Sequence, residues 1–454
     1  MISRSVALIT GMSLLAGLAV GQDPKLSVKV AAQPSLASSS PLELQSITVE
    51  ELVREALSKN PAISSASHTV SAERAKIPQA RALPDPTFGA GWMGNPWPFS
   101  VQTGDPSSYR SISAMQMLPF PGKRGLRGQI AGKEVDASQW DLEAVRRRVV
   151  ADVKAAYYDY WYYEKAIRTT RENRDLLSKL CQIAETRYRV GKSMQTDVLR
   201  SQVEVSILLQ KQTTLEQQRA TAQARLNALL ARDPDAPLPP VADVAGASPL
   251  SYSLEELYKL ARENDPDYQR MQKMVERNQL AMNLAQKDYL PDLNVGYMYQ
   301  QRPDMKDMHG FTFTVNIPVF YKSKQQEGVR QAKEEELSAS SARDNRQNEL
   351  YFDLKQNYLA AKASENLLKL FSQGLVPQSS LALESSMSAY QVGNVDFLTL
   401  MGNFTTLLNY QTDYYRELAN YQTSLARMEA VTGADLTGPQ PITETPVPQA
   451  PDKQ

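Results

Sequence analysis

Cysteine and histidine are almost absent from this chain. Its 454 residues contain one cysteine, Cys181, and two histidines. One thiol cannot form an intrachain disulfide, so the fold does not depend on such crosslinks. The sequence also offers no phosphate-binding loop and no metal-ligand spacing, which leaves no catalytic residues, metal ligands or cofactor site to assign. We therefore predict that the protein is not an enzyme.

Net charge and long apolar runs are also lacking. The 50 basic and 50 acidic residues cancel, so there is no basic surface of the kind that binds nucleic acid. The apolar run Val6–Val20 follows Arg4, and Ala19-Val-Gly21 fits a small-residue cleavage site. This pattern predicts a signal peptide over residues 1–21, because the run is too short for a spanning helix. We expect the protein to be exported.

Proline and glycine are missing from several long stretches. Four stretches contain neither residue: 133–190, 192–233, 329–373 and 403–432. The first, of 58 residues, would form a helix of roughly 87 Å at 1.5 Å per residue. Gly191 and Gly393 each lie near the break between two such stretches. Each half of the chain is therefore predicted to form a very long helical hairpin.

The chain repeats itself after about 200 residues. Three motifs occur in both halves: residues 48–61 and 253–266, 83–85 and 290–292, and 188–191 and 390–393. A duplication on this scale predicts two similar halves in one body. We place the first repeat at residues 47–233, a proline-rich linker at 234–251 and the second repeat at 252–435. Residues 22–46 are predicted to be a flexible lead segment and 436–454 a disordered tail.

The returning arms of the two hairpins carry a heptad pattern. In the second repeat the seam is strict, with only Gln411 breaking it: Phe397, Leu400, Phe404, Leu407, Gln411, Tyr414, Leu418, Tyr421, Leu425 and Met428. The first repeat has a weaker seam: Val198, Val205, Leu208, Leu215, Ala222, Leu226 and Leu229, broken by Ser201, Gln212 and Arg219. This period predicts coiled-coil packing. An ordinary helical bundle is the alternative.

Short segments of alternating polarity separate the helical stretches. Residues 87–93, 110–118, 293–300 and 311–317 each predict a strand. Their length approaches the roughly 9 to 11 residues of a tilted transmembrane strand. The side chains predicted to face lipid are Leu293, Val295, Tyr297, Tyr299, Phe311, Phe313 and Val315. A small hairpin on a soluble protein is the alternative.

The number of strands decides the predicted assembly. Four strands cannot enclose a pore, and open sheet edges are not tolerated in lipid. If the strands span a membrane, three copies would supply twelve, enough for a channel. The expected fold is a mixed α and β membrane protein: a trimeric twelve-stranded β-barrel with four strands per chain, continued by a long α-helical coiled-coil barrel.

The duplicated unit and the two tip motifs resemble the TolC-like outer-membrane efflux proteins. The tip motifs are Tyr188-Arg-Val-Gly191 with Thr196-Asp-Val-Leu199, and Tyr390-Gln-Val-Gly393. The resemblance covers about residues 45–435. It implies a homotrimer in outer-membrane lipid with a large periplasmic portion. It also implies partners: a periplasmic adaptor, also called a membrane fusion protein, and an inner-membrane pump of the RND type.

Two stretches are similar to the heavy-metal branch of that family, the CzcC and CusC type. They are Gln116-Met-Leu-Pro-Phe-Pro-Gly-Lys-Arg124 at a strand-to-helix junction, and residues 376–378 with 390–400. The resemblance suggests an efflux channel that passively conducts heavy-metal cations or small toxic compounds. Alternatives are the exit duct of a type I protein secretion system and, from another class, a soluble periplasmic coiled-coil or adaptor protein.

The tip turns are the predicted functional site. By resemblance, they would dock the adaptor through Val190, Gly191, Lys192, Val392, Gly393, Asn394 and Val395. The family often gates its tunnel with acidic residues after the second tip, but Thr399 and Gly402 occupy those positions here. Asp197, Asp396 and Thr399 are therefore the candidate lumen or gate residues. A threefold ring of either aspartate would attract cations, whereas the alternative is a solvated carboxylate at a helix end.

Four further features carry predictions of their own. Met298, Met305, Met308 and His309 are soft ligands near one another in sequence, but methionine is also a common filler. The aromatic run Tyr157–Tyr163 is too far along its helix for a membrane interface, so helix packing is expected. Lys123, Arg124 and Arg127 would meet headgroups or satisfy local carboxylates, and Cys181 is expected to be a small packed residue.

Overall fold

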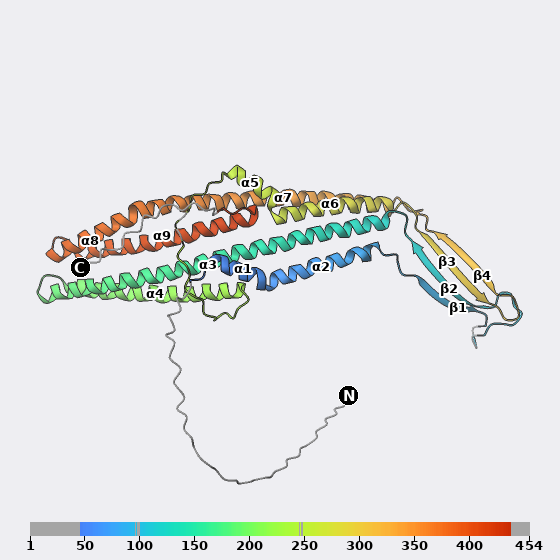
Figure 1. Cartoon of the computed structure of the whole chain (residues 1–454), viewed down its shortest axis with the longest axis horizontal. Helices are drawn as coiled ribbons and strands as arrows, with labels where there is room; N and C mark the ends of the chain where they lie inside the picture. The colour runs from blue at the N-terminus through green and yellow to red at the C-terminus, as the bar shows by residue number, and fades with distance from the viewer. Residues whose placement is uncertain (1–45, 96, 98–99, 245, 247, 437–454) are drawn as a thin grey trace, which may run out of the picture. The chain divides into compact units, whose positions relative to one another are not determined.

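The computed structural model describes residues 46–436, except 96, 98, 99, 245 and 247. The first repeat contains α1 (Val49–Lys59), α2 (Pro61–Arg81), β1 (Thr87–Met93), β2 (Tyr109–Leu118), α3 (Lys123–Arg189) and α4 (Gln195–Leu229). The second contains α5 (Leu254–Asn264), α6 (Pro266–Lys287), β3 (Leu293–Gln301), β4 (Met308–Val315), α7 (Gln325–Leu370), the π-helical turn η1 (Phe371–Leu375), α8 (Val376–Val392) and α9 (Phe397–Thr432). The order of elements is the same in both (Figure 1), which confirms the duplication.

The two repeats begin with the same helix-capping chemistry. The Thr48 hydroxyl accepts the Glu51 N–H at 3.4 Å, and the Glu51 carboxylate accepts the Thr48 N–H at 3.1 Å. Ser253 and Glu256 form the same reciprocal pair at 3.3 and 2.8 Å. Such capping boxes satisfy amide groups that the first helical turn leaves unpaired. The repeated motif therefore fixes where α1 and α5 start.

Helix α3 starts ten residues before the glycine-free stretch that predicted it, at Lys123. Gly128 lies inside this extension, beside the side chain of Arg81 on α2. A Cβ at Gly128 would lie 2.3 Å from Arg81 Nε, which is closer than atoms can approach. This glycine therefore permits close helix packing and does not end the helix.

The second hairpin contains a π-helical turn that the first lacks among the described residues. Buried Val149 and Leu350 occupy equivalent positions 201 residues apart, whereas Gly191 and Gly393 at the tips lie 202 apart. A π turn inserts one extra residue into an α-helix. η1 therefore accounts for the additional residue, and it ends two residues before Pro377, which cannot donate a helical hydrogen bond.

The predicted heptad seam of α9 is confirmed as a buried face. Phe397, Leu400, Phe404 and Tyr421 are each at most 2% exposed. Gln411, the polar break in the seam, is half-buried and accepts a 3.0 Å hydrogen bond from Asn173 of α3. The break therefore has a partner across the helix interface, as buried polar groups require.

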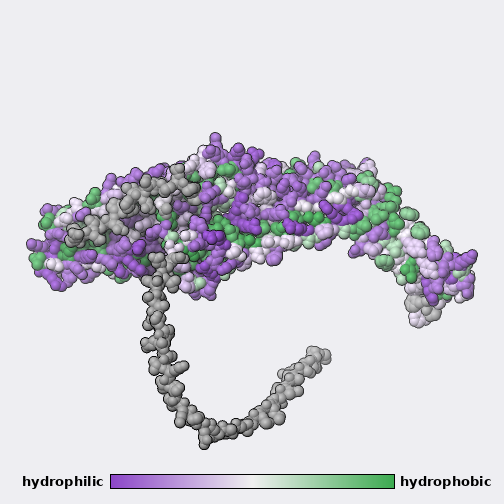
Figure 2. Space-filling model, in the orientation of Figure 1, coloured by the Kyte–Doolittle hydropathy of each residue, from purple (hydrophilic) through white to green (hydrophobic). Residues whose placement is uncertain are grey.

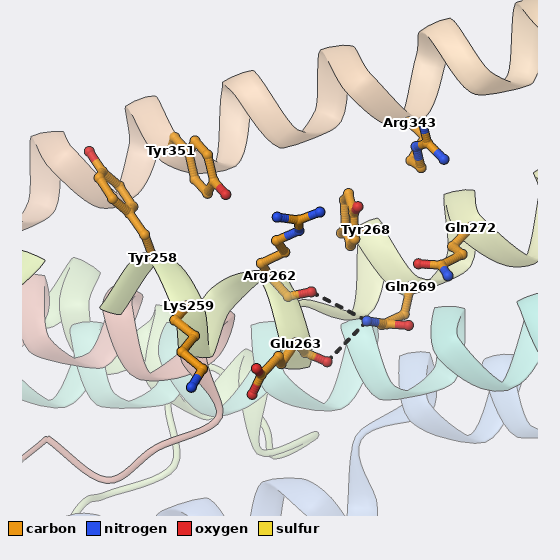
Figure 3. A pocket seen from close by; sticks show the side chains of 9 residues that line it. All are labelled: Tyr258, Lys259, Arg262, Glu263, Tyr268, Gln269, Gln272, Arg343 and Tyr351. Atoms are coloured by element: carbon orange, nitrogen blue, oxygen red, sulfur yellow. Dashed lines mark hydrogen bonds between the residues drawn. The ribbon is translucent and has the colours of Figure 1, made fainter. Parts of the chain in front are cut away.

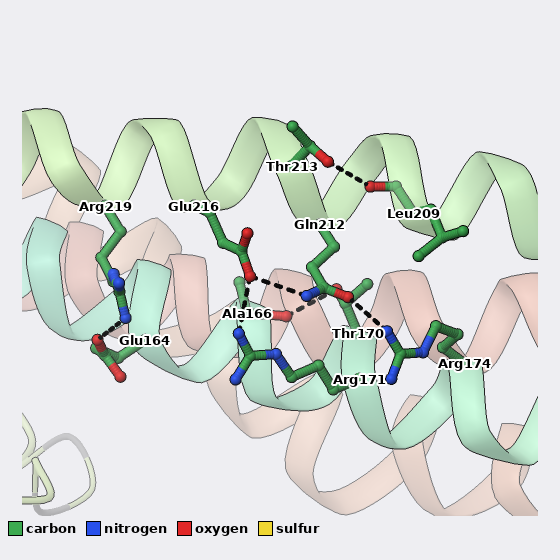
Figure 4. A network of polar contacts seen from close by, with 10 residues as sticks. All are labelled: Glu164, Ala166, Thr170, Arg171, Arg174, Leu209, Gln212, Thr213, Glu216 and Arg219. Atoms are coloured by element: carbon green, nitrogen blue, oxygen red, sulfur yellow. Dashed lines mark hydrogen bonds and ion pairs between the residues drawn. The ribbon is translucent and has the colours of Figure 1, made fainter.

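Two of the three polar breaks in the first hairpin, Gln212 and Arg219, have charged partners on α3 (Figure 4), whereas Ser201 donates to the Val198 carbonyl of its own helix. Arg219 donates to Glu164 at 2.9 Å, and Gln212 accepts from Arg174 at 3.1 Å. Glu216 joins the same row by accepting from Arg171 at 2.8 Å. Because the Arg219 and Arg171 pairs are more than a third exposed, each contributes less than about 1 kcal/mol to stability. These ion pairs therefore matter more for the register of α3 against α4 than for the stability of the hairpin.

The aromatic run at residues 157–163 lies in the larger hydrophobic core. Tyr157 and Trp161 are at most 3% exposed, and the Trp161 ring meets Tyr415 of α9 edge-on at 5.7 Å. The Tyr157 hydroxyl donates toward the carbonyl oxygens of Ile47 and Ala242. The expectation of helix packing is confirmed.

The segment between the repeats is tied to the start of the first repeat. Ile47 pairs with Val241 in a parallel bridge, and Leu250 is buried in the core. Leu436, which the sequence places in the disordered tail, is also buried, and its N–H donates to Glu429 at 3.2 Å. The remaining predictions for residues 1–21, 22–45 and 437–454 lie outside the described residues.

The four strands form one antiparallel sheet in the order β1-β2-β3-β4. Tyr297 lies opposite Phe311, and Val295 opposite Phe313. Within the described chain, β1 and β4 are edge strands with a free side each. The strand predicted over 311–317 runs instead from Met308 to Val315, so it starts three residues earlier and ends two residues earlier than expected.

Candidate docking and gate site at the helical tips

Both helical hairpins turn at a glycine in the left-handed conformation. Gly191 has φ +74° and Gly393 has φ +90°, values that side chains on L-residues rarely adopt. The Asn394 N–H donates to the Ala389 carbonyl at 2.9 Å, and the Lys192 N–H donates to the Arg187 carbonyl at 2.8 Å. These bonds close the ends of α8 and α3 in the manner of a helix C-cap.

The tip turns present exposed apolar residues. Val190 is 63% exposed and Val392 is 72% exposed. Gly191, Lys192, Gly393 and Asn394 are also exposed, whereas Val395 is half-buried. Side chains of this kind at the end of a hairpin can contact another protein without rearrangement of the core. Six of the seven predicted docking residues are therefore accessible in the single chain.

Arg187 ties the two tips together, and the sequence did not identify it. Its guanidinium donates to the carbonyl oxygens of Tyr390, of Gln391 at 2.6 Å, and of Lys192 at 3.1 Å. It also lies over the Tyr390 ring, 4.8 Å from the ring centre. One side chain at the end of α3 thus holds both the first tip turn and the end of α8. The sequence feature that could have identified Arg187 is a difference between the repeats, because Ala389 occupies the equivalent position in the second repeat.

The candidate gate residues have defined local roles. Asp396 is the N-cap of α9 and accepts the Thr399 N–H at 2.9 Å. Hydrogen bonds from the Thr399 side chain and backbone lower the pKa of Asp396, so it is ionised at neutral pH. Burial, followed by the nearby charge of Asp197, raises the pKa of the Tyr390 hydroxyl. Asp197 therefore acts on Tyr390 through its charge, while Asp396 and Thr399 pair with each other.

At the opposite end of the helices, one face of the sheet carries the predicted lipid-facing residues. Cross-strand pairing places all seven on the same face, because directly opposed residues point the same way. Phe311 is 73% exposed and Phe313 is 69% exposed. The other face carries small and polar residues such as Gly296 and Thr312. An uncovered aromatic face of this kind marks an interaction surface.

Hydrophobic residues also gather where the helices meet the sheet, as Figure 2 shows. The exposed residues between β4 and α7 include Ile317, Val319 and Phe320. Nearby, Lys123 is buried and donates to Asp292 and to the Leu290 carbonyl, both at 3.0 Å. Of the two roles considered for Lys123, the structure shows the satisfaction of local carboxylates.

The methionine and histidine group is not assembled into one site. Met298 and Met308 lie on the face of the sheet opposite to His309, as strand register requires. His309 Nδ1 instead contacts the Tyr297 hydroxyl at 2.7 Å. Among the described residues, no group of three or more His, Cys, Asp and Glu side chains is placed to hold a metal ion. Cys181 is half-buried and packs against the hydrophobic cluster near the tips.

Comparison with known proteins identifies the family. The outer membrane efflux protein family matches residues 52–232 and 257–434, which is most of the chain. The chain belongs to the outer membrane efflux protein family. Among curated relatives, the cobalt-zinc-cadmium resistance protein CzcC of Cupriavidus metallidurans is 22% identical over 398 residues, covering 85% of this chain and 90% of CzcC.

Solved structures of efflux channels share the fold. CusC superposes with a TM-score of 0.73 at 16% identity, over 85% of this chain and 91% of CusC. The outer membrane protein VceC of Vibrio cholerae gives a TM-score of 0.72 at 15% identity, over 86% of this chain and 96% of VceC. The protein is thus an outer-membrane efflux protein, and its two hairpins and four strands have the architecture of such channels. Among the described residues, no helix is both long and apolar enough to cross a membrane.

Proposed function

We propose that three copies of this chain close one twelve-stranded barrel and one helical tunnel. The free sides of β1 and β4 carry this proposal. Unpaired strand edges are not stable in lipid, and four strands are too few to surround a pore. Pairing of β4 with β1 of the next copy would satisfy both edges at once. The exposed Phe311 and Phe313 would then face the hydrocarbon region.

The tip turns would dock a periplasmic adaptor, which connects the tunnel to an inner-membrane RND-type pump. Support comes from the exposed Val190 and Val392 beside the two rigid glycine turns. The channel itself conducts passively, and the pump supplies the energy. No catalytic role is assigned to any residue, and the known family members named above are channels or resistance proteins.

Heavy-metal cations or small toxic compounds are the proposed cargo. The likeness to CzcC, described as a cobalt-zinc-cadmium resistance protein, supports the metal assignment. Rings of Asp197 or Asp396 in a trimer would favour cations at the tunnel end. Export of proteins by a type I secretion system is the second candidate, because the same duct could serve an ATP-driven exporter. A soluble periplasmic adaptor is not compatible with the family assignment.

Native mass measured in mild detergent tests the proposal. Protein extracted from isolated outer membranes should run as a heat-sensitive species near three times the 50.6 kDa chain. Heating should convert it to the monomer, because the shared barrel is held by interchain strand pairing. A monomer in the soluble fraction would show that the four strands never meet lipid, and the channel proposal would fail.

A further inference from the structure

A polar pocket of about 650 Å³ lies where α5, α6 and α7 meet (Figure 3). Its charged and aromatic lining residues are Tyr258, Lys259, Arg262, Glu263, Tyr268, Arg343 and Tyr351. Its volume falls within the roughly 300 to 1,000 Å³ of small-molecule sites. The pocket is separate from the tip turns and from the sheet, so no role in conduction or docking accounts for it.

Two of the three basic side chains that line this pocket have no ion-pair partner in the described part of the chain. Lys259 and Arg262 make no side-chain hydrogen bond or ion pair with another residue in the described part of the chain. Arg343 is paired, because it donates to Asp344 at 2.6 Å. Figure 3 shows the Arg262 guanidinium on the side of the Tyr351 and Tyr268 rings, whereas the side chains of Lys259 and Glu263 both point to the other side. Arg262 is exposed, and an accessible guanidinium beside tyrosine rings and without a counterion is suited to an anionic ligand.

The duplication provides an internal comparison for these residues. Equivalent positions lie 205 residues apart in α1 and α5, and 201 apart in α3 and α7. The first repeat has Val53, Leu57, Ile63, Leu142 and Val150 where the second has Tyr258, Arg262, Tyr268, Arg343 and Tyr351. Five positions that are apolar in the first repeat thus carry tyrosine or arginine side chains in the second. Because the first repeat forms the same helices with apolar residues, the fold itself does not require the polar set.

The aromatic rings narrow the class of ligand. The Tyr258 and Tyr351 rings lie 4.6 Å apart at 43° and form one wall of the pocket. Tyrosine rings stack on flat or sugar rings, and their hydroxyl groups donate and accept hydrogen bonds. We propose that this pocket binds a sugar-sized anion, with its carboxylate or phosphate on Arg262 and its ring against the tyrosines. The proposal goes beyond the channel function and does not depend on it.

Calorimetric titration of the intact, detergent-extracted protein tests the proposal. Two matched ligand pairs are compared: N-acetylmuramic acid with N-acetylglucosamine, and glucose 6-phosphate with glucose. Within each pair, the difference in affinity shows the effect of the negative charge. Between the pairs, it shows whether the pocket prefers a carboxylate or a phosphate. We expect one anionic member to bind and its neutral partner to bind at least about tenfold more weakly, the loss expected for one charged hydrogen bond. The stronger anion identifies the source as a cell-wall carboxylate or a sugar phosphate. Binding should weaken as sodium chloride is raised.

Two arginine variants provide the residue-level test. Arg262→Leu introduces the residue that the first repeat has at Leu57, so folding should be retained. It should lower the affinity for the anion at least about tenfold. Arg54→Leu on α1 is the matched control and should bind as the unchanged protein does. If neither anion binds, or if Arg262→Leu binds as tightly as the control, the pocket is not an anion site.

Discussion

At the scale of single residues, the differences between the repeats are as informative as the similarities. Shared residues such as Gly191 and Gly393 close both hairpins in the same way. Arg187 has no counterpart in the second repeat, where Ala389 lies at that position. It holds three carbonyl groups from two hairpins. At Arg187, the departure from the repeat is a contact between the two halves.

Replacement of Arg187 by alanine should loosen the tips. Loss of these charged hydrogen bonds should cost about 2 to 3 kcal/mol locally, while the core near the sheet stays intact. We expect higher single-channel conductance in planar bilayers, because the tunnel end is held less tightly. Arg189→Ala is the matched control, since Arg189 is exposed and, among the described residues, pairs only with Glu185 of its own helix. Equal conductance of the two variants would exclude a clamping role for Arg187.

Asp292 is the second residue with a specific prediction, at the junction of helix and sheet. Burial opposes its ionisation, but the Phe120 N–H at 2.7 Å and Lys123 at 3.0 Å together lower its pKa. Because its pKa is lower in the folded than in the unfolded state, ionised Asp292 stabilises the fold. This contribution is complete above the unfolded value of about 4 and is lost as pH falls below it.

Asp292→Asn should therefore change stability in a pH-dependent way. At pH 7 we expect a loss of about 3 kcal/mol, because Lys123 is left buried without its main partner. Thermal unfolding measured from pH 7 to pH 3 should show the difference from the unchanged protein shrinking below about pH 4. A constant difference over this range would mean that Asp292 is not ionised in the fold.

At the scale of elements, the alternation of polar and apolar residues predicted the faces of the strands. Register then showed that Tyr297 and Phe311 are directly opposed, as are Val295 and Phe313. The extent of the elements was harder to predict. Gly128 lies within α3 because Arg81 packs against it, and Gly374 lies within η1, a turn that absorbs one extra residue. Glycine alone cannot reveal whether it ends a helix or permits close packing.

Opposite faces of β4 should respond differently to charge. Phe313→Arg places a cation on the aromatic face, at a cost of about 2 to 4 kcal/mol if that residue lies near the bilayer centre. We expect little or no heat-sensitive trimer in the outer membrane. Thr312→Arg, one residue away on the other face, is the matched control and should assemble. Equal assembly of the two variants would contradict the assignment of the lipid face.

At the scale of the whole molecule, the single chain is incomplete as a channel. It leaves β1 and β4 with free sides and the aromatic face of the sheet uncovered. The chain belongs to the outer membrane efflux protein family. Its relative CzcC is described as a cobalt-zinc-cadmium resistance protein. Cargo is a property of the complete assembly, including the pump, so it requires a measurement in cells.

A deletion strain should reveal the cargo. We expect reduced growth in copper, silver, zinc or cobalt salts, with tolerance restored by the gene for the unchanged protein. The physical reason is that a blocked exit leaves the cation in the cell envelope. Resistance to drugs is measured in parallel as the control. If only drug tolerance falls, the metal assignment is wrong, whereas defective protein export with normal tolerance would favour the secretion system.

The sequence by itself determined the duplication, the long hairpins, the heptad seam and the strand faces. These features depend on the local periodicity of apolar residues and on the positions of glycine and proline, both of which can be read from short stretches of the sequence. Only the tertiary structure decided that Arg187 clamps both tips and that Lys123 is paired with Asp292. It also decided that Arg262 enters a tyrosine-lined pocket. Each of these contacts is between residues that are far apart in the sequence and that folding brings together. No local sequence pattern predicts which distant residues will meet.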